Sequence, residues 1–203
     1  MKSFFFIFAS LVLMTTGAFA QRSEGVVNEV PVPAFENQIT FTGGVTSVRF
    51  SSGFLGAANS LGLSVSPIVS AGVRGANVSF PITWGTVDGG SLRGEIMHSR
   101  FLLFQKGNAA VKLEGFIIDT TGPQPFINGL ASANGSVVGR IPLFNLDLST
   151  ATITQAGSVI QISGVGVTLR SEAAAALNSV FSTNAFVEGF NIGTATVSAA
   201  VGS

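Results

Sequence analysis

Beyond residue 37 the sequence consists of short runs in which apolar and polar residues alternate, separated by Gly, Asn, Asp and Pro. Alternation with a period of two places the apolar side chains on one face of a β-strand. FNLDL at 144–148 is the plainest case, with Phe144, Leu146 and Leu148 expected to point inward. A succession of such runs, each bounded by turn residues, predicts an antiparallel all-β domain.

Glycines interrupt the alternation within two of the longer runs. In QITFTGGVTSVRF the pair 43–44 separates Ile39 and Phe41 from Val48, which stands in the opposite phase. A glycine that shifts a period of two is typical of a β-bulge, where one extra residue is inserted into a strand. Gly164 shifts the phase of SVIQISGVGVTL in the same way, so we expect a bulge at both places.

Two further patterns indicate how strands are joined and which face they bury. VDGGSL at 87–92 has the residue types of a hairpin turn and lies between two alternating runs. AAVKLEGFIID at 109–119 places Val111, Leu113 and Ile117 on one apolar face and charged residues on the other. Both patterns favour antiparallel pairing of neighbouring strands.

Two segments break the strand pattern and predict short helices. SEAAAALNSVF at 171–181 begins with Ser171 as the expected N-cap, and its apolar residues then follow at helical spacing. SSGFLGAANSLG at 51–62 has a capping residue at one of its first two serines and Gly62 just past its end. Each follows an alternating run, so we expect the two helices to cover the open ends of a sandwich.

These patterns together predict an antiparallel β-sandwich, Ig-like or jelly-roll-like, with one or two short helices. The core is expected to contain the inward residues of the runs, namely Ile39, Phe41, Val48, Phe50, Phe80, Ile82, Ile96, Leu113, Ile117, Phe144, Leu146, Leu148, Ile160, Ile162, Val167 and Leu177.

The N-terminus predicts the compartment in which the protein acts. Residues 1–20 combine Lys2, an apolar run at 4–14 and a small-x-small cleavage pattern, which predicts a secretory signal peptide. The apolar run is too short for a membrane span, so no transmembrane segment is expected after cleavage. Residues 21–37 read as an exposed leader and 38–203 as a single domain, secreted to the cell surface or periplasm.

Charge and cysteine content exclude several classes of function. Without Lys2, nine basic and ten acidic residues remain, which gives no electrostatic basis for binding nucleic acid. The absence of cysteine excludes disulfides, thiolate metal sites and cysteine nucleophiles. Only 10% of residues are charged, so open sheet edges have little charge to keep them apart and predict a route to homo-oligomers.

His98, the single histidine, is the foremost candidate for chemistry. The strand period in LRGEIMHS puts it on the same face as Leu92 and Ile96, toward the core or its rim. A metal site needs several converging ligands, and a nucleophilic triad needs a base oriented by an acid. No spacing here supplies either, so His98 reads as a satisfied structural residue and no metal or catalytic site is expected.

The acidic residues give no catalytic pattern. They are spread singly along the strands and turns, and Asp119 before Thr-Thr-Gly-Pro reads as a turn residue. The acids considered are Asp88, Glu95, Glu114, Asp119 and Asp147. We therefore predict a protein that is not an enzyme.

The order of the motifs FPITWGTVDGGSLRGEIMHS, VKLEGFIID, RIPLFNLDLS and VGVTLRSEAAAALNSVFSTNAFVEGFNIGTATV resembles a group of secreted bacterial β-proteins of uncharacterised function. That group has a Phe-Pro-Ile-Thr-x-Gly…Gly-x-Ile-x-His-Ser-Gly-Gly pattern and is itself distantly similar to HtaA-type haem-trafficking domains. The resemblance covers roughly residues 39–198. This chain departs from the pattern at Arg100 and Phe101, which replace the final two glycines.

The resemblance implies a second hypothesis for the function. HtaA-type domains are expected to hold haem through a tyrosine with histidine support, and this chain has no tyrosine. His98 is then the one remaining candidate for binding haem. The leading hypothesis is an exported non-enzymatic structural or binding module without a cofactor, and the alternative is a small-molecule carrier of the HtaA-like type.

Overall fold

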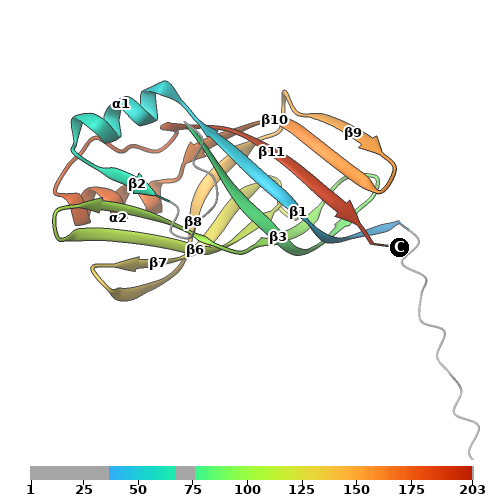
Figure 1. The fold of residues 1–203 in the computed structure, drawn as a ribbon, viewed down its shortest axis with the longest axis horizontal. Coiled ribbons are helices and arrows are strands. Elements are labelled where there is room, and N and C mark those ends of the chain that lie inside the picture. The colour runs from blue at the N-terminus through green and yellow to red at the C-terminus, as the bar shows by residue number, and fades with distance from the viewer. Residues whose placement is uncertain (1–36, 67–75, 203) are drawn as a thin grey trace, which may run out of the picture. The chain divides into compact units, whose positions relative to one another are not determined.

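The structure, a computed structural model, describes residues 37–66 and 76–202 and is an all-β protein with two short helices (Figure 1). The expected signal peptide and all but the last residue of the expected leader lie outside the described residues. The elements in chain order are β1 Gln38–Phe50, α1 Ser52–Ser60, β2 Ser64–Ser66, β3 Asn77–Asp88, β4 Gly94–His98, β5 Phe101–Lys106, β6 Ala109–Asp119, β7 Phe126–Ala133, β8 Ser136–Asp147, β9 Thr152–Ala156, β10 Val159–Leu169, α2 Ser171–Phe181 and β11 Asn191–Val201.

Eight of the strands close into an antiparallel barrel, so the predicted sandwich is wrong. Neighbouring strands follow the order β6-β4-β3-β1-β11-β10-β8-β7, and the last strand, β7, also pairs with the first, β6, which completes the ring. A strand in a sandwich and a strand in a small barrel both bury alternate residues, so the pattern predicts strands but not closure. The pairing of β6 with β7, from Val111 opposite Ala133 to Asp119 opposite Phe126, is what closes the sheet.

The remaining three strands extend the wall of the barrel. Two of the long strands, β6 and β10, each pair with two different strands along one side. β5 pairs with residues 109–114 of β6, whereas β4 pairs with residues 117–119 on the same side. In the same way β9 pairs with residues 159–163 of β10, and β8 pairs with residues 166–169. β2 adds to the outer side of β5. The barrel wall therefore forks on two sides.

Both expected bulges are confirmed. The register between β1 and β11 shifts between Phe41 and Gly43, and that between β10 and β11 shifts between Ile162 and Val165. Gly44 has a φ of 125°, and a Cβ there would lie 2.1 Å from the carbonyl oxygen of Ser198 on β11. A side chain at this position would push the two strands apart, so the bulge requires glycine.

A third bulge, which was not predicted, corrects one core residue. Gly115 takes a φ of 58°, and the register between β6 and β7 shifts between Glu114 and Ile117. The shift turns Phe116 and Ile118 into the core and leaves Ile117 only partly buried. Ile117 was therefore assigned to the wrong face, because unbroken alternation was assumed across a glycine.

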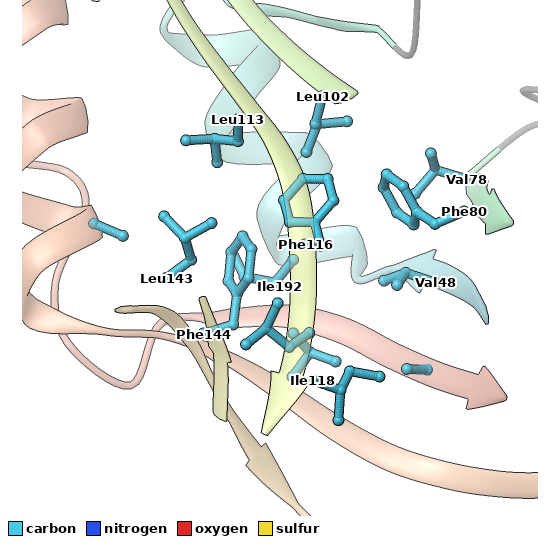
Figure 2. Packing of buried hydrophobic residues seen from close by; sticks show 14 of the residues in the cluster. Val48, Val78, Phe80, Leu102, Leu113, Phe116, Ile118, Leu143, Phe144 and Ile192 are labelled. Carbon is cyan, nitrogen blue, oxygen red and sulfur yellow. The ribbon is translucent and has the colours of Figure 1, made fainter. Parts of the chain in front are cut away.

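Most of the predicted core is confirmed, and Leu148 is the second correction. Leu148 is 41% exposed because β8 ends one residue earlier and the chain turns away from the barrel. Buried as predicted are Phe41, Val48, Phe80, Ile82, Ile96, Leu113, Phe144, Leu146, Ile160, Val167 and Leu177; partly buried are Ile39, Phe50 and Ile162. Figure 2 shows several of these side chains converging from different strands on the barrel interior.

Both helices lie at one end of the barrel, at the left in Figure 1, and not at two ends as expected. Phe54 of α1 and Ala173 and Leu177 of α2 line the same small space inside the barrel. α1 has Ser51 as its N-cap, whose Oγ accepts a hydrogen bond from the backbone N–H of Phe54. We call this the helix-capped end.

The caps of the helices agree with the sequence in one helix and differ in the other. Gly62 follows α1 with a φ of 67°, as expected of the residue after a C-cap. The N-cap of α2 is Arg170 and not Ser171, whose hydroxyl hydrogen-bonds Glu172 instead.

Neither helix within the described residues has the length and apolar character needed to cross a membrane.

Candidate ligand-binding site in the barrel interior

His98 lies at the end of β4 with its side chain inside the barrel, and the predicted inward face is confirmed. It is 6% exposed, and it stands opposite Ile82 of β3. Its Nε2 atom is 2.7 Å from Oγ1 of Thr46, itself a buried residue on β1. The imidazole and the hydroxyl form one buried polar pair in an otherwise apolar interior.

The second ring nitrogen of His98 has no partner. Nδ1 is buried and makes no hydrogen bond with any described residue. Burial lowers the pKa of His98 from 6.5 to about 4, and nearby backbone groups of Phe116 and Ile96 oppose this decrease without giving Nδ1 a hydrogen bond of normal geometry. The ring is therefore neutral at physiological pH.

A small cavity of about 50 Å³ surrounds the ring, and we call it the inner cavity. Its wall includes residues from every strand of the closed ring and one from β5. Besides His98 and Thr46, the lining residues are all aliphatic or aromatic: Val48, Phe50, Val78, Phe80, Leu102, Phe116, Ile118, Ile127, Phe144, Val167 and Ile192. Thr46 and His98 are thus the only polar residues beside this cavity among the described residues.

A larger space of about 220 Å³, which we call the outer cavity, occupies the far end of the barrel, away from the helices. Leu148 and Ile153 line it and are 41% and 54% exposed, so the cavity meets solvent beside these residues. Deeper in, Thr46, Ile118 and Ile127 belong to the walls of both cavities. The two cavities therefore adjoin along the barrel axis.

No charged side chain lines either cavity among the described residues. The outer cavity has two further hydroxyl groups, and both are already engaged in turns. Thr120 Oγ1 donates to the carbonyl of Leu92, and Ser91 Oγ donates to Asp88. The remaining wall is made almost entirely of apolar side chains, including Ile96, Leu146, Ala151, Ile162, Val165, Ala195 and Val197.

Sequence reasoning identified His98 but missed the outer cavity. Its lining residues are spread from Phe41 to Val197, and only closure of the sheet brings them together. Leu148 is the residue that could have pointed to this cavity, because the apolar alternation continues to it although the side chain is not fully buried. When the closed topology is not known, the same alternation predicts an ordinary core residue.

The acidic residues do not gather into a site. Asp119 accepts a hydrogen bond from the backbone N–H of Thr121, as expected of a turn residue, and Asp88 and Asp147 cap turns in the same way. Glu114 pairs with Lys112 at 2.7 Å on the outer face of β6. Among the described residues, no three His, Asp or Glu side chains are placed to hold a metal ion together.

The departure at Arg100 has a visible structural consequence. Arg100 takes a φ of 79°, in the left-handed region that glycine adopts without strain. The adjacent Ser99 is held by a hydrogen bond from its backbone N–H to the carbonyl of Pro81. The turn that follows His98 therefore keeps a glycine-like backbone although the residue is arginine.

Three solved structures from Corynebacterium glutamicum are similar to this chain. The C-terminal domain of HtaA matches with a TM-score of 0.61 at 15% identity, over 81% of this chain and 99% of that domain. The heme binding protein HtaB matches with a TM-score of 0.47 at 10% identity, over 81% of this chain and 96% of HtaB. A domain-swapped dimer of a histidine-to-alanine variant of the HtaA domain matches with a TM-score of 0.45 at 14% identity, over 94% of this chain and all of that one.

The first of these comparisons establishes the class of fold. The first match shows that the chain has the fold of the HtaA C-terminal domain, so the expected likeness to HtaA-type domains is confirmed for the fold. No protein-family model matches the sequence. No curated protein is similar to it either.

Proposed function

We propose that this chain is a small-molecule carrier that holds an apolar ligand in the far end of its barrel. The observation that carries the proposal is the outer cavity of about 220 Å³, which is lined by apolar side chains and reaches solvent beside Leu148 and Ile153. Mouths of β-barrels are common places for small-molecule sites, and eight strands enclose room for one small ligand. The resemblance to HtaA-type haem-trafficking domains, whose fold this chain shares, supports a binding role over a purely structural one.

Haem is the ligand that the resemblance to HtaA-type domains suggests, and the residues at His98 do not fit it. The chain has no tyrosine, and Nε2 of His98 is already bonded to Thr46. The space beside the ring is about 50 Å³, whereas pockets for drug-sized ligands hold roughly 300–1,000 Å³. We therefore propose a smaller apolar ligand, and no step of the proposed function passes through iron.

The carrier is further proposed to act outside the cytoplasm. The support is the signal-peptide pattern of residues 1–20, which lies outside the described residues. A carrier for an apolar molecule is useful in an aqueous compartment, because such a molecule dissolves poorly in water. Export of a tagged chain that depends on residues 1–20 would support this part of the proposal, and retention of the full chain in the cytoplasm would contradict it.

The test of ligand binding uses N-phenylnaphthylamine, a neutral apolar probe whose fluorescence rises in apolar surroundings. The purified protein should bind the probe, and Ala151→Trp, which places a large ring at the rim of the outer cavity, should weaken binding at least tenfold. Ala156→Trp is the matched control, because Ala156 is exposed on β9 and does not line the cavity. Failure of the wild-type protein to bind would overturn the proposal.

Hemin provides the second arm of the test. We expect no change in the Soret band that depends on His98, so hemin spectra should be the same with the wild-type protein and with His98→Ala. A Soret shift that His98→Ala abolishes would show that the barrel opens to admit haem. That result would replace the proposed ligand class by haem.

A further inference from the structure

The turn that joins β3 to β4 contains a leucine with an unusual backbone conformation. Leu92 has a φ of 55°, in the left-handed region that residues with a side chain rarely adopt. Glycine adopts this region freely, and asparagine can form a local hydrogen bond there, but leucine has neither advantage. The turn by itself therefore does not favour leucine, and strain of this kind points to a role for the side chain.

Hydrogen bonds hold the backbone of Leu92 on both sides. Its N–H donates to the carbonyl of Asp88 at 2.7 Å, and its carbonyl accepts from Oγ1 of Thr120 at 2.7 Å. The carboxylate of Asp88 also accepts hydrogen bonds from the backbone N–H groups of Gly90 and Ser91. All contacts of Leu92 in this network are made by its main chain, so they do not depend on its side chain.

The side chain of Leu92 lines the outer cavity. It is partly buried and packs against the core, while the neighbouring Gly90 and Ser91 line the same cavity and are exposed. The outer cavity therefore reaches solvent at this turn as well as beside Leu148 and Ile153. Leu92 stands at the boundary between the apolar space and the solvent.

The turn with Leu92 lies across the mouth of the outer cavity from Leu148 and Ile153. Around the ring, β3 is four strands from β8 in either direction, and β4 is four strands from β10. Leu148 follows β8, and Ile153 lies on β9, which pairs with β10. Branched apolar side chains thus border the mouth on two opposite sides.

A bulky apolar side chain in this position restricts passage. A ligand that enters or leaves beside Leu92 must displace its side chain, and the hydrogen bonds of the main chain oppose movement of the whole residue. Displacement also removes the side chain from its apolar contacts, which costs free energy. Association is slowed when it requires such a change in the protein, and opening of a lid often limits release.

We propose that Leu92 is the gate residue of the outer cavity. Its left-handed backbone holds the side chain at the mouth, and exchange of the ligand with solvent requires this side chain to move. The inference rests on the proposed carrier function and adds control of the exchange rate. A gate of this kind lets a carrier keep its ligand between uptake and delivery.

The test measures the association and dissociation rate constants of N-phenylnaphthylamine by stopped-flow fluorescence in the wild-type protein, Leu92→Ala and Leu92→Met. Both variants keep a Cβ atom in the left-handed backbone, and they differ in the size of the apolar side chain. Leu92→Ala should raise the association rate constant about tenfold, the order expected for the partial burial of one leucine side chain. Leu92→Met, which keeps the bulk, should leave that rate constant close to the wild-type value.

The association rate constant separates a gate from a residue that only contacts the ligand. Loss of a contact speeds dissociation and leaves association nearly unchanged, whereas loss of a gate speeds both. Faster association in Leu92→Ala is therefore the result that supports the proposal.

A second pair of variants protects the test from a folding failure. Leu92→Gly removes the side chain together with the cost of its backbone, so it should fold and should also speed association. Arg100→Gly is the matched control, because Arg100 also has a positive φ and does not line the outer cavity. Both rate constants in Arg100→Gly should equal those of the wild type.

The outcomes separate the gate from the carrier function. If the probe binds the wild-type protein and neither Leu92→Ala nor Leu92→Gly speeds association, the gate is overturned and the carrier function stands. Equal acceleration in Leu92→Met would also overturn it, because the effect would then come from a loosened turn and not from lost bulk. If the wild-type protein does not bind the probe, both proposals fall.

Discussion

The two ends of the barrel share several strands but are filled to different degrees. At the helix-capped end, α1 and α2 insert Phe54, Ala173 and Leu177, and the space left is about 20 Å³. At the far end no helix among the described residues enters, and about 220 Å³ remains. Protein interiors are normally packed as densely as organic crystals, and each void costs stability. Space kept at one end only is therefore a feature that function explains better than folding does.

The largest expected contrast between the ends is in the effect of truncating an aromatic or aliphatic side chain. Phe54 is 1% exposed and packs against Phe50 and Phe104. Phe54→Ala should lower the free energy of unfolding by about 3–5 kcal/mol because it leaves a cavity in a filled region. Ile153→Ala at the far end should change it by about 0.5 kcal/mol or less, because that side chain is half exposed. Chemical denaturation measures both, and equal losses would remove the contrast.

The acid stability of the barrel depends on the polar pair between the two ends. The pKa of His98 is lowered from 6.5 to about 4 by burial, so the unfolded chain binds a proton between these pH values that the folded chain does not. Stability should therefore fall as the pH falls from 6.5, by about 3 kcal/mol at pH 4. Urea titrations at several pH values would measure the loss.

The matched control for acid stability is His98→Leu/Thr46→Val, which should show a flat profile over the same pH range. Three carboxyl groups also have pKa values lowered by hydrogen bonds, namely those of Asp88, Asp147 and Glu172. They add losses only near and below their ordinary values, which are 3.8 for the two aspartates and 4.5 for Glu172. An unchanged pH profile in the double variant would assign the acid sensitivity to other groups.

Filling the two ends should have opposite effects. Ala195 of β11 lines the outer cavity, and Ala195→Val should raise the free energy of unfolding by about 1 kcal/mol while weakening binding of the apolar probe. Ala173 of α2 lies in the filled end, and Ala173→Val should lower the free energy of unfolding by about 1–3 kcal/mol through overpacking. Thermal unfolding and probe titration of both variants measure these effects. A lower free energy of unfolding in both variants would show that the outer cavity cannot hold a larger side chain.

The smallest expected effect is at the turn where the wall passes from β4 to β5. Arg100 holds a left-handed backbone that costs a residue with a side chain roughly 1–2 kcal/mol, and glycine adopts it freely. Arg100→Gly should therefore stabilise the fold by less than about 1 kcal/mol, because the greater freedom of glycine in the unfolded chain offsets part of the gain. Ser99→Gly, at a residue without positive φ, should destabilise by about 0.5–1 kcal/mol. Denaturation curves measure whether Arg100→Gly raises, and Ser99→Gly lowers, the free energy of unfolding.

Several of the strands, two bulges and both helices could be predicted from the sequence because each depends on local spacing. The bulge at Gly115 was missed, and with it the inward turn of Phe116, because the three residues after this glycine are all apolar and therefore do not show a change of phase. Closure into a barrel could not be predicted, since it depends on the pairing of β6 with β7 and not on alternation.

The candidate site, like the fold, could be predicted from the sequence only in part. The inward orientation of His98 followed from its place in a strand with Ile96, and the structure agrees. Its partner Thr46 could not be predicted, because the two residues are 52 positions apart and lie on β1 and β4, which are brought near each other only by their pairing with β3. The outer cavity was beyond sequence reasoning for the same physical reason: empty volume belongs to the arrangement of strands and has no residue type of its own.

Closure of the ring also limits how copies of this chain could join. Among the described strands, β2 and β9 each pair with one neighbour, and β2 is three residues long. β9, Thr152–Ala156, is exposed along its whole length and has no charged residue to repel a second copy. Two copies meeting there in antiparallel fashion would use up each other's free edge, so assembly through this ribbon would stop at a symmetric pair and would not grow into a fibre.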